Sequence, residues 1–287
     1  MMGKNSIHSL SRGTGHDARL QARRKAGKFR DRCGMTSITT VVPSRFFPAP
    51  IARGSGLTHR GRVRERNEDA ILTDPSGRLW AVADGMGGYG HGDVASDIVI
   101  DCLETIGDDE NADVALLDRL AEANRRVCHK AAEAGFGQMG ATVVAMIIDR
   151  GVARLAWAGD SRAYLLRGRR LRMLTRDHTW VQSLVDRGEL SPDQVENHPE
   201  AHIVTRAIGG AEHVEVDRVD LPLMHGDRLM LCSDGLPRCV YEQTIEAILA
   251  AAADAEDAAG LLVREALDNG APDNVSAIVI DITDGPG

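Results

Sequence analysis

Residues 79–92 read LWAVADGMGGYGHG, and this stretch decides the fold. The apolar run before Asp84 predicts a short buried strand. Five glycines follow within the next eight residues, and glycine permits positive φ and the close approach of two backbones. A helical pattern begins at Asp93. Asp84 is therefore expected where a rigid strand meets a loop, a position that can aim a side chain.

Three interpretations of this stretch compete. Residues 85–90 fit the G-x-G-x-x-G pattern of a dinucleotide-binding fold, with Glu104 near the place of a ribose-binding acid. Alternatively, Asp84 is a metal ligand and the carbonyl of Gly85 joins it. The third interpretation is a plain turn between strand and helix, which is the usual meaning of an isolated Asp-Gly. The rest of the chain has to separate these alternatives.

Composition and charge narrow the class of protein. Of the 287 residues, 43% are hydrophobic and only 3% aromatic, so a full core can form from Leu, Val, Ile and Ala. The net charge is −8, but residues 1–34 hold nine Lys/Arg and two Asp, so the rest of the chain carries −15. This acidic body argues against nucleic acid as the main partner. It is compatible with carboxylates gathered around cations.

The five cysteines are scattered, odd in number and without a C-x-x-C pair, which favours reduced thiols and a cytoplasmic protein. No apolar run approaches the ~20 residues that span a bilayer, and the N-terminus lacks the apolar stretch of a secretory signal. We expect a disordered basic tail over residues 1–54, one domain over residues 55–283, and a short tail over residues 284–287.

Periodicity predicts a definite order of strands and helices after the first tail. A strand-like segment over residues 56–73 carries alternating arginines, Arg64 among them, and then Glu68 and Asp69. Helices are predicted over residues 93–106 and 114–134, a meander of short strands over 141–174, a helical excursion over 179–203, strands over 214–221 and 227–232, helices over 241–252 and 255–269, and a last strand over 274–282.

The meander argues against the dinucleotide-binding alternative. Short strands joined by tight turns form an antiparallel sheet, whereas a Rossmann domain needs a parallel crossover after its glycine loop. We therefore predict an α+β fold, a four-layer α-β-β-α sandwich with two mainly antiparallel sheets flanked by helix pairs.

The setting of Asp84 recurs along the chain. Asp234 and Asp160 also follow apolar strands, Asp273 precedes the last strand, and Glu68-Asp69 ends the arginine-bearing segment. Acids at the junction of strand and loop are in the usual place of site residues. Five such positions are hard to explain as five separate turns.

If these carboxylates converge, electrostatics limits what the site can be. Two like charges about 4 Å apart repel by roughly 4 kcal/mol at an effective dielectric constant of 20, and divalent cations remove that cost. Oxygen ligands without a His/Cys cluster favour Mg²⁺ or Mn²⁺ over Zn²⁺, and several acids suit two ions that share a carboxylate. Arg64 is then the natural bidentate donor to phosphate oxygens. This constellation suits metal-assisted hydrolysis of a phosphate ester.

Eight short motifs occur in order from about Gly56 to Ile282: GRVRERNED (61–69), DGMGG (84–88), GAT (140–142), AGDSR (158–162), LTRDH (174–178), HP (198–199), SDGL (233–236) and DNVS (273–276). Each is weak alone, but the order and spacing are very specific. With them the sequence resembles the bacterial metal-dependent Ser/Thr protein phosphatases of the protein phosphatase 2C type.

The resemblance implies a ligand set for two Mn²⁺ or Mg²⁺ ions at one end of the sheets. Asp84 would bridge the two ions, and the Gly85 carbonyl would bind one of them. Asp234 and Asp273 would hold the other.

The resemblance also implies roles around these two ions. Glu68 and Asp69 would bind metal directly or through waters, and Asp160 with Asp234 would suit a third, weaker ion. Arg64 would take the phosphate. Residues 179–203 would be a flap beside the site, which His178 would help to order.

Two positions depart from the pattern of this family. His59 stands where an Asp is common, and Tyr89 stands where a His often follows the glycine pair. A His there could protonate the leaving serine oxygen, because its pKa suits neutral pH. His91, two residues on, is the candidate for this role. Tyr89, a metal-bound water or an ordinary surface histidine are the alternatives.

The activity implied is hydrolysis of phosphoserine or phosphothreonine by a metal-activated bridging water, without a phosphoenzyme intermediate. The implied protein is a cytoplasmic monomer whose partners are phosphorylated proteins, a bacterial Ser/Thr kinase and the targets of that kinase. The rival is an inactive phosphoprotein-binding module on the same fold, against which the retained acids argue.

Overall fold

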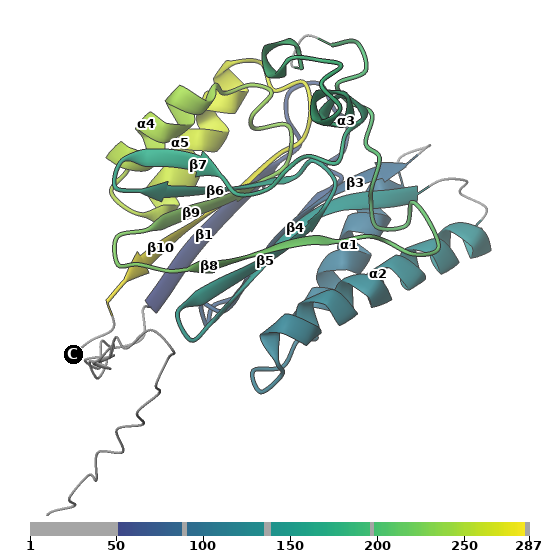
Figure 1. Cartoon of the computed structure of the whole chain (residues 1–287), viewed down its shortest axis with the longest axis horizontal. Coiled ribbons are helices and arrows are strands. Elements are labelled where there is room, and N and C mark those ends of the chain that lie inside the picture. The colour runs from purple at the N-terminus through teal and green to yellow at the C-terminus, as the bar shows by residue number, and fades with distance from the viewer. Residues whose placement is uncertain (1–50, 88–90, 135–138, 196–197, 285–287) are drawn as a thin grey trace, which may run out of the picture. The chain divides into compact units, whose positions relative to one another are not determined.

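Two five-stranded antiparallel sheets form the centre of the described chain, which a computed structural model covers over residues 51–87, 91–134, 139–195 and 198–284 (Figure 1). The first sheet has the order β1 (Ile51–His59), β10 (Val275–Thr283), β9 (Arg228–Cys232), β6 (Arg162–Arg167) and β7 (Arg170–Met173). The second has the order β2 (Asp69–Thr73), β3 (Leu79–Gly87), β4 (Met139–Asp149), β5 (Val152–Ala158) and β8 (Asp217–Pro222).

Each sheet is covered on its outer face by a pair of helices (Figure 1). α1 (Gly92–Glu104) and α2 (Ala112–Ala134) pack on the second sheet, and α4 (Glu242–Ala251) and α5 (Ala255–Asp268) pack on the first. A third apolar cluster, which includes Trp80, Met146 and Ile280, fills the space between the sheets. The predicted four-layer α-β-β-α sandwich is confirmed.

The predicted meander over residues 141–174 is divided between the two sheets. The hairpin of β4 and β5 stays in the second sheet, but β6 and β7 belong to the first. The chain changes sheet at Gly159, whose φ is +116°, and a Cβ there would lie 2.3 Å from Thr142 Cβ. Only glycine fits this crossing, which puts Asp160 between the two sheets.

The arginine-bearing segment is a loop and not a strand, contrary to the prediction. β1 ends at His59, and β2 begins only at Asp69. Gly61 has a φ of +76°, and the Asn274 side-chain amide donates to the carbonyls of Arg60 and Arg66 at 3.0 and 2.9 Å. The alternating arginines therefore lie on a loop, and hydrogen bonds from Asn274 hold that loop in place.

The ends of the domain differ slightly from the prediction. β1 begins at Ile51, inside the segment predicted as a tail over residues 1–54, which corrects that boundary. Residues 1–50 and 285–287 lie outside the described part of the chain. No helix in the described part is long and apolar enough to cross a membrane.

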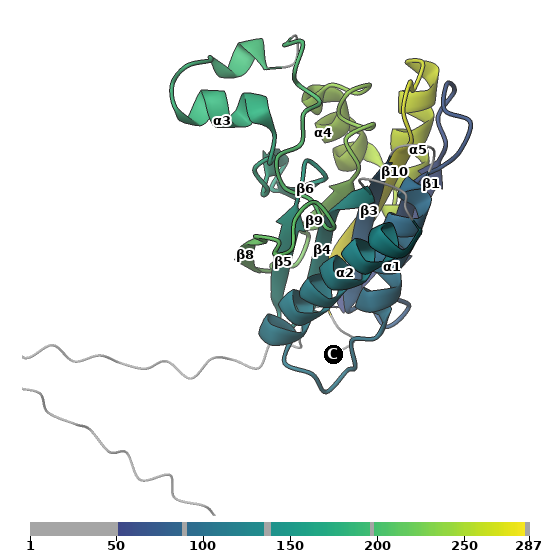
Figure 2. The ribbon, with the colours of Figure 1, turned by 90° about the vertical axis from the view of Figure 1, so that its right-hand side faces the viewer.

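The excursion over residues 179–203 contains α3 (Trp180–Asp186) and a short 3₁₀ helix, η1 (Pro192–Gln194). Thr179 caps α3 by accepting a hydrogen bond from the Gln182 backbone, and Ser191 begins η1 with Pro192 at its first position, as predicted. Thr179 pairs with Val204 at the base of the excursion. Figure 2 shows α3 standing off the sandwich.

Candidate metal centre

Five aspartates from separate segments interact at one end of the two sheets. Asp69 begins β2, Asp84 lies in β3, Asp160 follows β5, Asp234 follows β9, and Asp273 precedes β10. Asp69 is directly opposite Asp84 in the β2–β3 ladder. The predicted convergence is present, because antiparallel strands of both sheets begin and end at this edge.

Asp69 is the most tightly held of these acids. It is buried, and its Oδ2 accepts hydrogen bonds from Ser233 Oγ at 2.8 Å and Ser276 Oγ at 2.6 Å. Its Oδ1 is buried without a hydrogen-bond partner. Burial raises the pKa of Asp69 to about 7 against the effect of the two serines, and Asp234 and Asp273 add to the rise.

The same causes act on three neighbouring carboxyl groups. Burial, followed by the charges of Asp69 and Asp234, raises the pKa of Asp84 well above its ordinary value. Burial and then Asp234 raise the pKa of Asp160 to about 7. The pKa of Asp234 is also raised by burial. Desolvation and like charges both favour the neutral acid, and for Asp234 they outweigh the lowering effect of Arg238.

Glu68 and Gly85 connect this cluster to the first residue of α1. Glu68 Oε1 accepts from the Gly92 backbone at 3.0 Å, and the Glu68 carbonyl accepts from the Gly85 backbone at 3.0 Å. A Cβ on Gly85 would lie 2.0 Å from the Gly92 carbonyl oxygen. Gly85 is therefore required by the close approach of two backbones, and it lies inside β3 rather than in a loop.

Two arginines lie against the outer carboxylates. Arg64 Nε and Nη2 each lie 2.9 Å from an oxygen of Asp273, a bidentate pair. Arg238 Nη2 lies 2.5 Å from Asp234 Oδ2, and its Nη1 lies 3.5 Å from Asp273 Oδ2. The sequence predicted Arg64 but not Arg238. The available signal was the spacing of four residues between Asp234 and Arg238 on one turn.

The donor set fits hard divalent cations. It consists of oxygen atoms, which Mg²⁺ and Mn²⁺ prefer, and the buried Asp69 Oδ1, which has no hydrogen-bond partner, is available to such an ion. Within the described ranges, no three His, Cys, Asp or Glu side chains are already close enough to enclose an ion. Arg64 and Arg238 hold Asp273 and Asp234 instead, so closing a ligand shell requires these side chains to shift.

His91, the predicted general acid, lies at the start of α1. His91 occupies the N-cap position of α1, next to Gly92, which contacts Glu68. Tyr89 lies outside the described residues.

His178 is buried and stacks on Trp157, and its Nδ1 accepts from the Gly159 backbone at 3.1 Å. His178 thus connects the base of the excursion to the turn that carries Asp160.

Of two large cavities among the described residues, one is lined by acids of the cluster. One of about 630 Å³ lies under the excursion and is lined by Asp160, Asp234, Arg238 and Val181, among others. The other, of about 760 Å³, is lined by Met86, Arg206 and neighbours and by none of the five aspartates. The first is large enough for a peptide side chain beside the acids.

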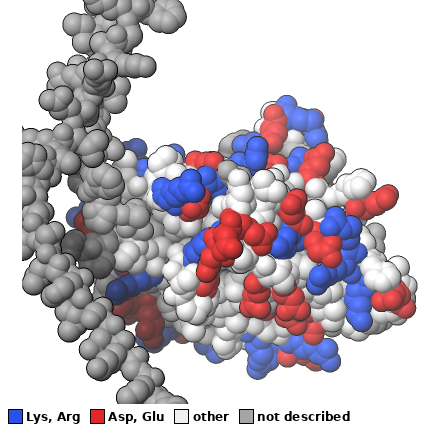
Figure 3. Space-filling model, turned by 90° about the horizontal axis from the view of Figure 1, so that it is seen from below, with Lys and Arg blue, Asp and Glu red and all other residues white. Residues whose placement is uncertain are grey.

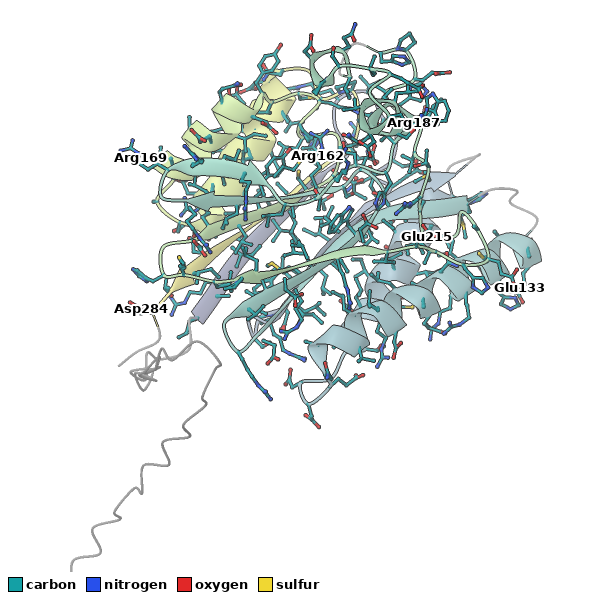
Figure 4. The ribbon with its side chains drawn as sticks, viewed as in Figure 1. Glu133, Arg162, Arg169, Arg187, Glu215 and Asp284 are labelled. Atoms are coloured by element: carbon teal, nitrogen blue, oxygen red, sulfur yellow. The ribbon has the colours of Figure 1, made fainter. Side chains whose placement is uncertain are left out.

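Some charged side chains outside the five aspartates form ion pairs of their own, and others are exposed. Arg162 lies amid the ribbon in Figure 4, where it binds Asp177 at 2.7 Å, whereas Arg169 and Glu133 project from the edge. The face in Figure 3 carries acidic and basic side chains interspersed, without a continuous basic surface on that side.

Comparison with known proteins gives one consistent result. The family model described as protein phosphatase 2C matches residues 55–269. The chain is 38% identical over 238 residues to the serine/threonine protein phosphatase PstP of Mycobacterium tuberculosis, covering 82% of this chain and 46% of that one. It thus spans about half the length of that relative. It is 35% identical to the serine/threonine phosphatase stp of Listeria welshimeri, covering 78% of this chain and 93% of that one.

A solved structure gives the same result. The catalytic domain of PstP in complex with two manganese ions superposes with a TM-score of 0.75 at 35% identity, covering 82% of this chain and all (100%) of that one.

Proposed function

This chain belongs to the protein phosphatase 2C family, and on that premise we propose that it is a protein serine/threonine phosphatase. The observation that carries the proposal is the gathering of five aspartates from both sheets, buried enough to raise the pKa of four of them. A folded protein keeps so costly a cluster where cations compensate it.

Two Mn²⁺ or Mg²⁺ ions are the proposed cofactors, as in the manganese complex of PstP. Asp84 would be shared between them, with the Gly85 carbonyl on one side and Asp234 and Asp273 on the other. When bound, such ions acidify water and stabilise charge on a phosphoryl group.

Three further acids complete the proposed ligand set. Glu68 and Asp69 would serve the two ions directly or through water, and Asp160 with Asp234 would serve a third.

Arg64 is the proposed phosphate-binding residue. Its guanidinium already forms a bidentate pair with a carboxylate, and its side chain is 52% exposed at the edge of the cluster. A phosphate presents the same two-oxygen edge to a guanidinium. His91 is the proposed donor of a proton to the leaving serine or threonine oxygen, since its N-cap position is adjacent to the Gly92–Glu68 contact.

The substrates we propose are phosphoserine and phosphothreonine in proteins, and the partners are a Ser/Thr kinase and its targets in a signalling pathway. Residues 51–283 would form the catalytic domain of a cytoplasmic monomer, with the excursion over residues 179–203 as a flap over the 630 Å³ cavity.

Steady-state hydrolysis of p-nitrophenyl phosphate and of a phosphothreonine peptide, with and without Mn²⁺, tests the proposal. We expect turnover that depends on Mn²⁺ and is lost in Asp84→Asn. The matched control is Asp108→Asn, because the side chain of Asp108 is 86% exposed and lies outside the cluster. Binding of the peptide without turnover in Mn²⁺ would favour the inactive phosphoprotein-binding module.

A further inference from the structure

We propose that Arg238 sets the cation affinity of the acid cluster, because its guanidinium and a bound cation compete for the carboxylates of Asp234 and Asp273. The inference rests on the proposed metal centre and concerns a residue to which that proposal gives no role.

The backbone fixes Arg238 beside the cluster. The Arg238 N–H donates to the Asp234 carbonyl at 3.1 Å, which closes one turn after β9. Leu236 and Val240 on either side of it are buried, so the turn is anchored in the apolar core under α4 and α5. The base of the Arg238 side chain therefore has little freedom, whereas the side chain as a whole is 40% exposed.

The guanidinium of Arg238 contacts two proposed ligands at once. It lies 2.5 Å from Asp234 Oδ2 and 3.5 Å from Asp273 Oδ2. Arg64, by contrast, contacts Asp273 alone of these two acids and has the geometry for a phosphate. Arg238 is thus a cation tethered to the same oxygens that a metal ion would need.

A guanidinium and a divalent ion cannot both lie against these oxygens without repulsion. This site is partly exposed, with surroundings nearly as polar as water. There, a unit positive charge a few Å from a divalent ion weakens binding of the ion by about tenfold. The released side chain has somewhere to go, because Arg238 also lines the 630 Å³ cavity. Arg238 therefore raises the cation concentration that the site needs and stabilises the cluster before cations arrive.

Isothermal titration with MnCl₂ tests this on the whole chain, with Arg238→Met as the variant. We expect the Mn²⁺ dissociation constant to fall by about tenfold, and the Tm in EDTA to fall below that of the wild type because the acids lose a counter-charge. Arg238→Lys keeps the charge and should stay within about threefold of the wild type. The control is Arg125→Met, since Arg125 pairs with Glu122 on α2 and is remote from the cluster.

The opposite sign would overturn the inference. If Arg238→Met is folded by circular dichroism and binds Mn²⁺ equally or more weakly, then Arg238 positions the carboxylates for the cation instead of competing with it. Arg238→Gln gives the same readout if the methionine variant does not fold. A wild-type chain that binds no Mn²⁺ would remove the metal centre itself, a result distinct from failure of the Arg238 variants.

Discussion

Asp84→Asn should stabilise the metal-free protein in EDTA, and it should abolish the stabilisation that added cations give. Asp84 is directly opposite Asp69 in the β2–β3 ladder and is the acid on which most of the others act. The substitution keeps the shape and removes one charge. The side-chain amide that it introduces can donate to Asp234, whose charge acts on Asp84.

The size of this stabilisation can be estimated from the repulsion between Asp69 and Asp84. Two carboxylates about 5 Å apart repel by roughly 3 kcal/mol at an effective dielectric constant of 20. At pH 8 Asp69, with a pKa of about 7, is mainly ionised, but the raised pKa of Asp84 lets Asp84 bind a proton and relieve part of this repulsion. We expect the free energy of unfolding in EDTA to rise by about 1–2 kcal/mol, and the Tm by about 3–6 °C for a domain of this size.

Differential scanning calorimetry at pH 8, with EDTA or with Mn²⁺, is the assay. Mn²⁺ at a hundredfold excess over its dissociation constant should stabilise the wild type by about 2.7 kcal/mol, or about 5–11 °C, and should leave the variant unmoved. Asp108→Asn should behave as the wild type in both buffers. A variant that is less stable in EDTA, or that still gains the full shift with Mn²⁺, would refute the reasoning.

Three further predictions concern single side chains. Arg64→Ala should raise KM for a phosphopeptide by about tenfold with a smaller loss of kcat, because it removes a bidentate phosphate donor; an unchanged KM would count against its assignment. His91→Ala should lower kcat for a phosphoserine peptide by about a hundredfold but spare p-nitrophenyl phosphate, whose leaving group needs no proton; equal losses would remove His91 from the role. Burial lowers the pKa of His178 below its ordinary 6.5 despite Asp217, so its stabilising contribution is complete above pH 6.5 and is lost as the pH falls through the folded-state pKa. The Tm of His178→Gln should therefore fall less than that of the wild type between pH 6.5 and about pH 5; parallel curves of Tm against pH for the two proteins would contradict this.

Elements with strong local signals could be predicted closely. The meander predicted over residues 141–174 contains β5 (Val152–Ala158), and the turn before β5 has Arg150 and Gly151 at positive φ. In this turn, neighbouring residues determine the conformation. The loop after His59 could not be predicted, because its alternating arginines imitate a strand and its shape depends on Asn274, more than two hundred residues away.

The candidate site shows the same division. The repeated placement of acids at strand ends was enough to predict that Asp84, Asp234 and Asp273 come together. The contact of Glu68 with the first residue of α1 and that of Arg238 with Asp273 were not predicted. Both depend on distances between segments that are remote in sequence, and no local pattern encodes them.

The acid cluster takes its members from both sheets: Asp69 and Asp84 belong to one, and Asp234 and Asp273 adjoin strands of the other. A cation bound there would cross-link the two sheets at one end only, whereas apolar contacts hold them together along the rest of their length. Amide exchange should then slow in a gradient on adding Mn²⁺, most at the end of the sheets that carries the cluster and least at the turn between β4 and β5.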